Sequence, residues 1–323
     1  MRGIRSGLAA AAVLVLAAGT AHAQTYPSKP VHVINGFQPG GPTDVIGRIV
    51  ADWLTKAMGQ AFIVDAKPGA AGNIAGEYVA GSAPDGYTLY LAAWSALIVN
   101  KVLYKNLAYD PDTALTPITI VAYNQLPLVV SVKLPVVNFA EFIGYAKAHP
   151  GKLNHGSPGI GSQPHLADEL LKQRLGFQSE HVPYRGSAPF SQGLARGEVQ
   201  WGFDAANTAL AGVSAGTARI LAITGTKRDP ILPDVPTIAE LGVNDSDWAG
   251  YFSLVGPAGM PRGVVDALFY TLWRGLKDPE VVQRLRNLGL HPMGTPPDES
   301  ARIFARDRAN WAKVVRNSNI KVE

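Results

Sequence analysis

The sequence predicts an α/β protein with two lobes, each a mainly parallel sheet flanked by helices. Short β-prone runs alternate along the chain with helical patterns of about 10 to 15 residues, which is typical of βαβ units. The chain has 323 residues, 47% of them hydrophobic, and is therefore long enough to bury two separate cores. Two further β-prone stretches lie where a chain would cross from one lobe to the other. Together these observations favour two α/β units over a single sheet.

The first strand and the first helix are specified in detail. Residues 31–34 are β-prone, and residues 45–58 repeat apolar pairs every four positions, so that one wide stripe of the helix is apolar. Pro42 suits the first helical position and Gly59 suits the helix end. A second helix start is indicated at residue 138, where an Asn is followed three positions later by a Glu.

Two stretches are candidates for crossings between lobes. Residues 116–132 are β-prone throughout, too long for one ordinary strand, and lack the composition of a linker; residues 248–255 form the second candidate. We therefore expect lobe 1 to hold residues 24–122 and 251–323, and lobe 2 to be an insertion of residues 123–250. Periplasmic binding proteins have this two-lobed, hinged architecture and close on a ligand in the cleft between the lobes.

The first 23 residues have the form of a secretory signal peptide. Arg2 and Arg5 supply the positive end, residues 8–18 are uninterrupted and apolar, and Ala-His-Ala at residues 21–23 has the small-x-small form of a cleavage site. The apolar run is about half the roughly 20 residues that a spanning helix needs, so a retained membrane anchor is the weaker alternative. We expect cleavage after Ala23 and a periplasmic location.

Composition and charge exclude several classes of protein. The chain has no Cys, which excludes disulfide frameworks, thiolate metal sites and catalytic cysteines. Removing the signal leaves 27 Lys plus Arg against 25 Asp plus Glu, a net charge of +2, with no basic patch to suggest nucleic acid as a partner. The seven His are dispersed, without metal-ligand spacing. We expect no metal and no cofactor.

Two glycine-rich loops are candidates for the ligand site. Residues 37–44 (FQPGGPTD) follow the first strand, and residues 156–162 (GSPGIGS) precede a later helix. Ligands in open α/β sheets bind outside the carboxyl ends of the strands. Glycines let the backbone approach a ligand, and the free N–H groups at a helix start favour an anion. Either loop by itself is more often only a tight turn before a helix, so the pair carries the prediction of an anion site.

Six motifs in a fixed order give the chain a family resemblance. They are residues 37–44, 67–74 (KPGAAGNI), 85–89 (DGYTL), 159–162 (GIGS) with His165, 182–186 (VPYRG) and 233–237 (PDVPT). This order resembles that of the Bug receptors, the periplasmic solute-binding proteins of tripartite tricarboxylate transporters, over essentially the whole mature chain. The resemblance implies two α/β lobes, a carboxylate held in the cleft largely by backbone amides and water, and delivery to a membrane permease. It further implies a monomer that is not an enzyme.

The resemblance also implies which residues face the cleft. By position they are Phe37, Pro39, Gly40, Gly41, Asp44, Ser95, Gly159, Gly161, Ser162 and His165, with Tyr184, Gly186 and Asp204 as further candidates. Several have an ordinary structural interpretation as well. Asp44 suits a first helical turn, and Ser162 suits an N-cap. His165 and Tyr184 could simply pack, and Asp204 could cap a turn.

The sequence departs from the family pattern beside the expected cleft. Ala66 and Ala71 replace the usual Asn and Gly, and Ala96 and Leu97 stand where Thr and His are expected. Together with Trp94, the changes at Ala96 and Leu97 predict an apolar wall, which suits a ligand with one anionic end and an aromatic or aliphatic body better than a compact tricarboxylate. The alternative is that Trp94 points into the core of its lobe.

Two other functions compete with transport. A secreted serine hydrolase could use Ser162, His165 and either Asp168 or Asp204, but the nucleophile elbow G-x-S-x-G fails here at both glycine positions. A sensor that closes on its ligand and then contacts a membrane kinase would have the same cleft. The sequence favours binding without catalysis and leaves transport and sensing as alternatives.

Overall fold

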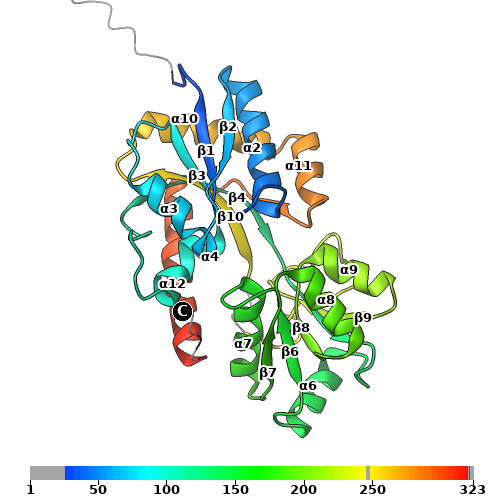
Figure 1. Ribbon diagram of the computed structural model, residues 1–323. Helices are drawn as coiled ribbons and strands as arrows, with labels where there is room; N and C mark the ends of the chain where they lie inside the picture. The colour runs from blue at the N-terminus through cyan, green and yellow to red at the C-terminus, as the bar shows by residue number, and fades with distance from the viewer. Residues whose placement is uncertain (1–25, 245–247, 319, 321–323) are drawn as a thin grey trace, which may run out of the picture.

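The computed structural model of the chain describes residues 26–244, 248–318 and 320 (Figure 1). The expected signal peptide lies outside these residues. Among the helices in the described ranges, none has the length and apolar character to cross a membrane. Two sheets, each flanked by helices, form two lobes, which agrees with the predicted α/β class and two-lobed arrangement (Figure 1).

Lobe 1 is built on a six-stranded sheet. Its strands, in spatial order, are β11 (His291–Pro292), β4 (Leu115–Asn124), β10 (Gly250–Pro257), β3 (Thr88–Ala93), β1 (Val31–Asn35) and β2 (Phe62–Ala66). The pairs of β1 with β2 and β3 are parallel, whereas β10 and β11 pair antiparallel with their neighbours. The helices are α2 (Pro42–Met58), η1 (Ala70–Gly72), α3 (Asn73–Ala80), α4 (Trp94–Ile98), α5 (Asn100–Leu103), α10 (Arg262–Gly275), α11 (Pro279–Arg286) and α12 (Pro297–Asn317).

Lobe 2 is built on a five-stranded sheet. Its strands, in spatial order, are β7 (Glu180–Pro183), β6 (Asn154–Ser157), β8 (Trp201–Phe203), β5 (Pro127–Ser131) and β9 (Ala218–Ile223). Only the pairs of β6 with β7 and β8 are parallel. The helices are α6 (Phe139–Ala148), α7 (Gln163–Leu175), α8 (Ser187–Arg196) and α9 (Ala206–Ser214). Both sheets are therefore mixed where the sequence predicted mainly parallel ones, because strands that connect the lobes pair antiparallel within each sheet.

The local signals in the sequence produce the elements expected from them. Helix α2 begins at Pro42 and ends at Gly59, whose positive φ of 73° is the left-handed conformation that glycine adopts at a helix end. Its apolar stripe, which includes Ile46 and Leu54, is buried against the sheet. Asn138 caps α6, accepting the N–H of Glu141 through its side chain at 2.9 Å.

The long β-prone stretch is two strands, one in each sheet. β4 ends at Asn124 in lobe 1 and β5 begins at Pro127 in lobe 2, so the chain crosses between the lobes at residues 125–126. The return crossing leads into β10, whose first residue pairs with Asn124. The division of the chain at residues 123 and 250 remains our proposal for the lobe boundaries. Helix α12 adds a third link, since Gln173 Nε2 of α7 donates to Ser318 Oγ just beyond the end of α12 at 2.6 Å.

Candidate functional site

A cavity of about 340 Å³ lies between the two lobes. Lobe 1 contributes the ends of β1 and β3 and part of β10, and lobe 2 contributes the loop between β6 and α7. The lining residues are Phe37, Ala71, Ala93, Trp94, Ser95, Asn124, Pro158, Gly159, Ile160, Gly161, Ser162, Gln163, Tyr251 and Phe252. The cavity thus lies outside the carboxyl ends of β1, β3 and β6, where open α/β sheets bind their ligands.

None of these lining residues carries a formal charge. The polar groups that reach the cavity are hydroxyls, side-chain amides and backbone amides, and four of the lining side chains are aromatic. An ion bound here would be stabilised by dipoles and hydrogen bonds, because no opposite charge lines the cavity.

The second glycine loop forms one side of the cavity and leads directly into α7. Ser162 caps the helix: its Oγ donates to the carbonyl of Gly159 at 2.7 Å and accepts the N–H of His165 at 3.4 Å. The N–H of Gly161 is also engaged, donating to His165 Nδ1 at 3.0 Å. In the described chain the N–H groups of Ile160 and Gln163 have no hydrogen-bond partner. These two donors, at the positive end of α7, suit an anion.

His165 lies behind this loop and holds it in place. The residue is buried and its ring stacks on His181, with 3.7 Å between ring centroids. Burial lowers the pKa of His165 to about 4, and burial together with the neighbouring histidines lowers the pKa of His181 to about 3. Both imidazoles are therefore neutral at pH 7, which leaves the Nδ1 lone pair of His165 available to accept the Gly161 N–H.

The first glycine loop contributes Phe37 alone to the cavity lining, and Pro39, Gly40, Gly41 and Asp44 lie outside the lining. The buried carboxylate of Asp44 accepts the N–H of Gly40 at 3.0 Å and Arg48 Nε at 2.9 Å. Burial raises the pKa of Asp44, but the hydrogen bonds from Arg48 and Gly40 outweigh it, and the pKa is below its usual value. Asp44 thus stabilises the loop and the first turn of α2.

The wall at α4 differs from the sequence prediction. Trp94 and Ser95 line the cavity, but Ala96 and Leu97 are buried in the core and do not. The hypothesis of an apolar wall formed by Ala96 and Leu97 is wrong, because the helix begins at Trp94 and turns Ala96 and Leu97 toward the core. Trp94 itself is only 3% exposed and meets Trp311 of α12 edge to face, with ring centroids 5.1 Å apart.

The three further candidates lie within lobe 2 and outside the cavity lining. The N–H of Gly186 donates to the carbonyl of Pro158 at 2.9 Å, which ties the start of α8 to the second glycine loop. Tyr184 donates its hydroxyl to Glu198 at 3.3 Å. Asp204 is fully buried and accepts the N–H of Ala205 at 2.8 Å. The hydrogen bonds of these residues stabilise the second glycine loop or the rest of lobe 2.

Several lining residues were not named individually from the sequence, although two of them, Pro158 and Ile160, lie in the predicted second glycine loop. The unnamed residues are Ala71, Ala93, Asn124, Pro158, Ile160, Gln163, Tyr251 and Phe252. Asn124 Nδ2 donates to Gln163 Oε1 at 3.1 Å, and Gln163 Nε2 donates to the carbonyl of Trp248 at 2.9 Å, so both crossings meet the start of α7 here. The predicted crossings were an available signal, because strands that cross between two lobes must form the base of the cleft.

Ser162 and His165, the residues considered for a serine hydrolase, are not arranged as a nucleophile and its base. The Ser162 hydroxyl accepts the backbone N–H of His165, which is the hydrogen bond of a helix cap. The His165 ring instead accepts the N–H of Gly161. Among the residues that the structure describes, no group of three His, Cys, Asp or Glu side chains is arranged to hold a metal ion.

Similarity to known proteins agrees with this architecture. The sequence profile of the tripartite tricarboxylate transporter family receptor, TctC, matches residues 46–320. Protein BugT of Bordetella pertussis is 33% identical over 320 residues, 98% of each chain. The structure of R. palustris Rpa4515 with adipate is 35% identical, covering 92% of this chain and 99% of that chain with a TM-score of 0.79. MatC from Rhodopseudomonas palustris with bound malate is 30% identical, covering 90% and 100% with a TM-score of 0.74. The chain therefore belongs to the family of tripartite tricarboxylate transporter receptors.

Proposed function

We propose that this chain is a periplasmic receptor that captures a small carboxylate in the interlobe cavity and delivers it to a tripartite-type membrane permease. The observation that carries the proposal is an uncharged cavity, formed by both lobes, in which the unpartnered N–H groups of Ile160 and Gln163 lie at the start of α7. The family membership and the adipate and malate of the two similar structures support it. The receptor would act as a monomer, without turnover, after export and removal of residues 1–23.

The lining also restricts the class of carboxylate. Backbone amides and the dipole of α7 stabilise an anionic group, but no Asp or Glu lines the cavity to pair with an ammonium. A ligand with an amino group would bury that charge without a partner, at a cost of several kcal/mol. We therefore expect carboxylates without an amino group to bind better than the matching amino acids. The volume of about 340 Å³ suits a small molecule.

A binding screen of residues 24–323 tests the proposal. Adipate, malate, citrate, benzoate and 2-aminoadipate are compared by thermal shift and then by calorimetry. A true ligand at about 100 times its dissociation constant adds roughly 2.7 kcal/mol to the free energy of unfolding. The comparison of adipate with 2-aminoadipate measures the effect of an added ammonium group on affinity. Failure of every carboxylate to stabilise the protein would contradict the proposal.

The location of the site is tested by Ile160→Asp. Ile160 lines the cavity, is 53% exposed and is outside the left-handed region, so a carboxylate can be added there without backbone strain. Repulsion of the ligand should weaken binding by about tenfold or more. Val137→Asp is the matched control, because Val137 is 64% exposed on the same lobe but does not line the cavity. Equal binding by the two variants would place the ligand elsewhere.

A further inference from the structure

A second cavity lies behind the two stretches of chain that connect the lobes. Its volume is about 420 Å³. In the first crossing Tyr123 and Gln125 line this cavity, whereas Asn124 between them lines the interlobe cavity. In the second crossing Phe252 lines the interlobe cavity and Tyr251 borders both. Side chains of an extended chain alternate between its two faces, so the crossings form a thin wall with one cavity on each side. We call the second one the hinge cavity.

Both lobes border the hinge cavity, and each contributes one charged side chain without a partner. Lobe 2 contributes Lys227, in the loop after β9, and lobe 1 contributes Glu299, in the first turn of α12. Both residues are exposed, and among the described residues neither side chain has a hydrogen-bond or ion-pair partner. The backbone carbonyl of Lys227 accepts Gln125 Nε2 at 2.8 Å, which holds its loop against the first crossing. Opposite charges from the two lobes therefore border the same space.

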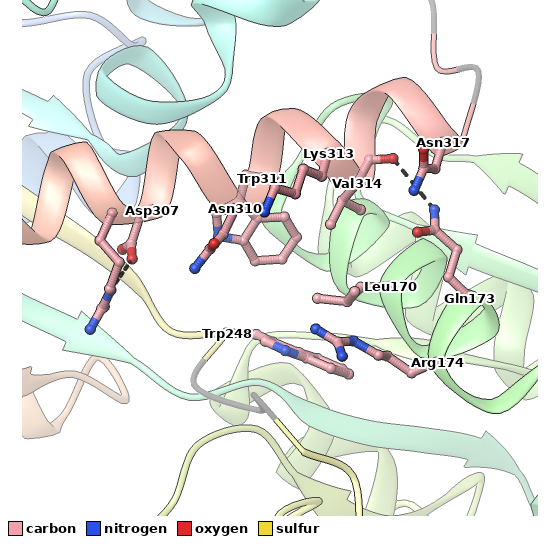
Figure 2. A pocket seen from close by; sticks show the side chains of 11 residues that line it. Leu170, Gln173, Arg174, Trp248, Asp307, Asn310, Trp311, Lys313, Val314 and Asn317 are labelled. Carbon is pink, nitrogen blue, oxygen red and sulfur yellow. Dashed lines mark hydrogen bonds and ion pairs between the residues drawn. The ribbon is translucent and has the colours of Figure 1, made fainter.

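The other charged side chains that line the hinge cavity are already engaged. Arg228 Nε donates to the two carboxylate oxygens of Glu240 at 3.1 and 3.0 Å. Arg306 Nε donates to Asp307 at 2.8 Å, an interaction drawn as a dashed line in Figure 2, and both of these residues have further interactions. Among the charged groups that line the cavity, the two unpartnered side chains are therefore the ones able to form a new pair when the lobes move.

Rotation of the lobes about the crossings changes the two cavities in opposite directions. Because the crossings lie between the cavities, a movement that brings the lobes together on one side of the wall separates them on the other. Beside the wall, a space of about 620 Å³ between α12 and α7 leaves room for such a rotation (Figure 2). Closure of the interlobe cavity on a ligand therefore draws the two unpartnered charges apart.

From this arrangement we propose that Lys227 and Glu299 form an interlobe ion pair, the hinge pair, that stabilises the receptor with its interlobe cavity open. When the hinge cavity narrows, the ammonium and the carboxylate attract one another across it. The described arrangement, in which both lobes line the interlobe cavity and the pair is not made, lies on the closed side of this equilibrium. The hinge pair lowers ligand affinity, because it reduces the fraction of molecules in the closed arrangement. This inference rests on the proposed function, since it assumes closure on a carboxylate.

Calorimetry with adipate at low ionic strength tests the hinge pair, using residues 24–323. Lys227→Glu and Glu299→Lys each replace attraction by repulsion, so each should tighten adipate binding by about two- to fivefold. The double variant, Lys227→Glu with Glu299→Lys, restores the pair with the charges exchanged and should return to the affinity of the parent. Because both residues are exposed, the variants should fold as the parent does, which thermal melting checks.

Lys147→Glu and Glu77→Lys are the matched controls. They make the same charge changes at exposed positions of α6 in lobe 2 and of α3 in lobe 1, and neither residue lines either cavity. Both controls should keep the affinity of the parent. Single hinge variants that bind adipate no more tightly than the parent would overturn the proposal. A double variant that stays as tight as the single variants would also overturn it, because the effect would then come from net charge and not from a pair.

Small-angle X-ray scattering without ligand distinguishes failure of the hinge pair from failure of the proposed function. At low ionic strength the parent and the double variant should have a larger radius of gyration than either single variant, because only they can form the pair. If all four proteins scatter alike, the hinge pair is wrong even where adipate binds. If no carboxylate binds and the difference in scattering is present, the proposed function fails and the hinge pair stands.

Discussion

At the scale of single residues, the interlobe cavity is shaped by side chains that do not line it. Asn35 holds Phe37 through two hydrogen bonds of 3.1 Å to its backbone, Asp44 holds Gly40, and His165 holds Gly161. Such residues fix the positions of backbone groups, and a change in any of them would move the lining without removing a lining residue. The hydrogen bonds of these residues therefore hold the backbone of an uncharged cavity in place.

Asp204 is predicted to make the stability of the protein depend on pH. Burial raises its pKa from 3.8 to about 6, despite hydrogen bonds from Ser187, Ala205 and Ser191. Because the folded state holds this proton more tightly, the contribution to stability is complete below about pH 4 and is lost as the pH rises through about 6. Asp204→Asn should therefore raise the free energy of unfolding at pH 7 by up to about 2–3 kcal/mol.

Urea unfolding of the parent and of Asp204→Asn between pH 4 and pH 7.5 checks this prediction. The difference between the two proteins should grow with pH over that range. Asp234→Asn is the control, because Asp234 is exposed and its replacement should leave the pH profile unchanged. A difference that stays constant with pH would show that the burial of Asp204 is not the cause.

At the scale of elements, α7 has two roles. At its start, the N-cap residue Ser162 and the first helical residue Gln163 line the cavity. Its last turns carry Gln173 and Arg174 beside α12. One helix thus links the interlobe cavity to the contact between the lobes. The proposed function therefore predicts that ligand binding depends strongly on the start of α7.

Ser162→Ala should weaken both the helix and the site. Loss of the N-cap hydroxyl should lower the free energy of unfolding by about 0.5 to 2 kcal/mol. Asn138→Ala removes the cap of α6, which is remote from the cavity, and should cost a similar amount. Melting and calorimetry of both variants separate the effects: only Ser162→Ala should weaken carboxylate binding. If the two variants bind alike, the Ser162 hydroxyl has no role at the site.

At the scale of the whole molecule, two crossing strands and one helix connect the lobes. The base of the cleft is tightly packed at Gly250, where a Cβ would lie 2.1 Å from Gln163 Oε1 and 2.8 Å from Asn124 Oδ1. Both atoms are the ends of flexible side chains, so an added methyl group would displace the side chains and leave the backbone in place. The contact between the second crossing and α7 is thus sensitive to one carbon atom.

Gly250→Ala should therefore weaken carboxylate binding much more than it affects folding, since it separates Asn124 from Gln163 at the cavity. Calorimetry and thermal melting of the variant give the two quantities. Gly144→Ala is the control, because Gly144 lies in α6 with no atom near its missing Cβ. Unchanged ligand affinity in Gly250→Ala would mean that the Asn124–Gln163 contact is not needed for binding.

Export is the second prediction at this scale. The small residues Ala21 and Ala23 fit the pockets of a signal peptidase, so the exported chain should begin at Gln24. Mass spectrometry of the intact protein recovered from periplasm gives its N-terminus directly. Recovery of a chain that still carries residues 8–18 would contradict the prediction.

The sequence by itself determined the features that depend on residues a few positions apart. The apolar repeat of α2, Pro42 at its start, Gly59 at its end and the Asn138 cap all act within about one helical turn. The two glycine loops were located in the same way, as turns between a strand and a helix. The family resemblance added the expectation that these loops face one another across a cleft.

The tertiary structure decided which residues line the cavity. Asn124 and Tyr251 are far apart in the sequence and meet only because β4 and β10 pair antiparallel in the sheet of lobe 1. Leu97 is apolar in either environment, and only the start of α4 at Trp94 turns it into the core. Likewise, the N–H groups of Gly40 and Gly161 are hydrogen-bonded within the protein only because Asp44 and His165 lie beside them. Such outcomes depend on how separate elements pack together, which local sequence patterns do not encode.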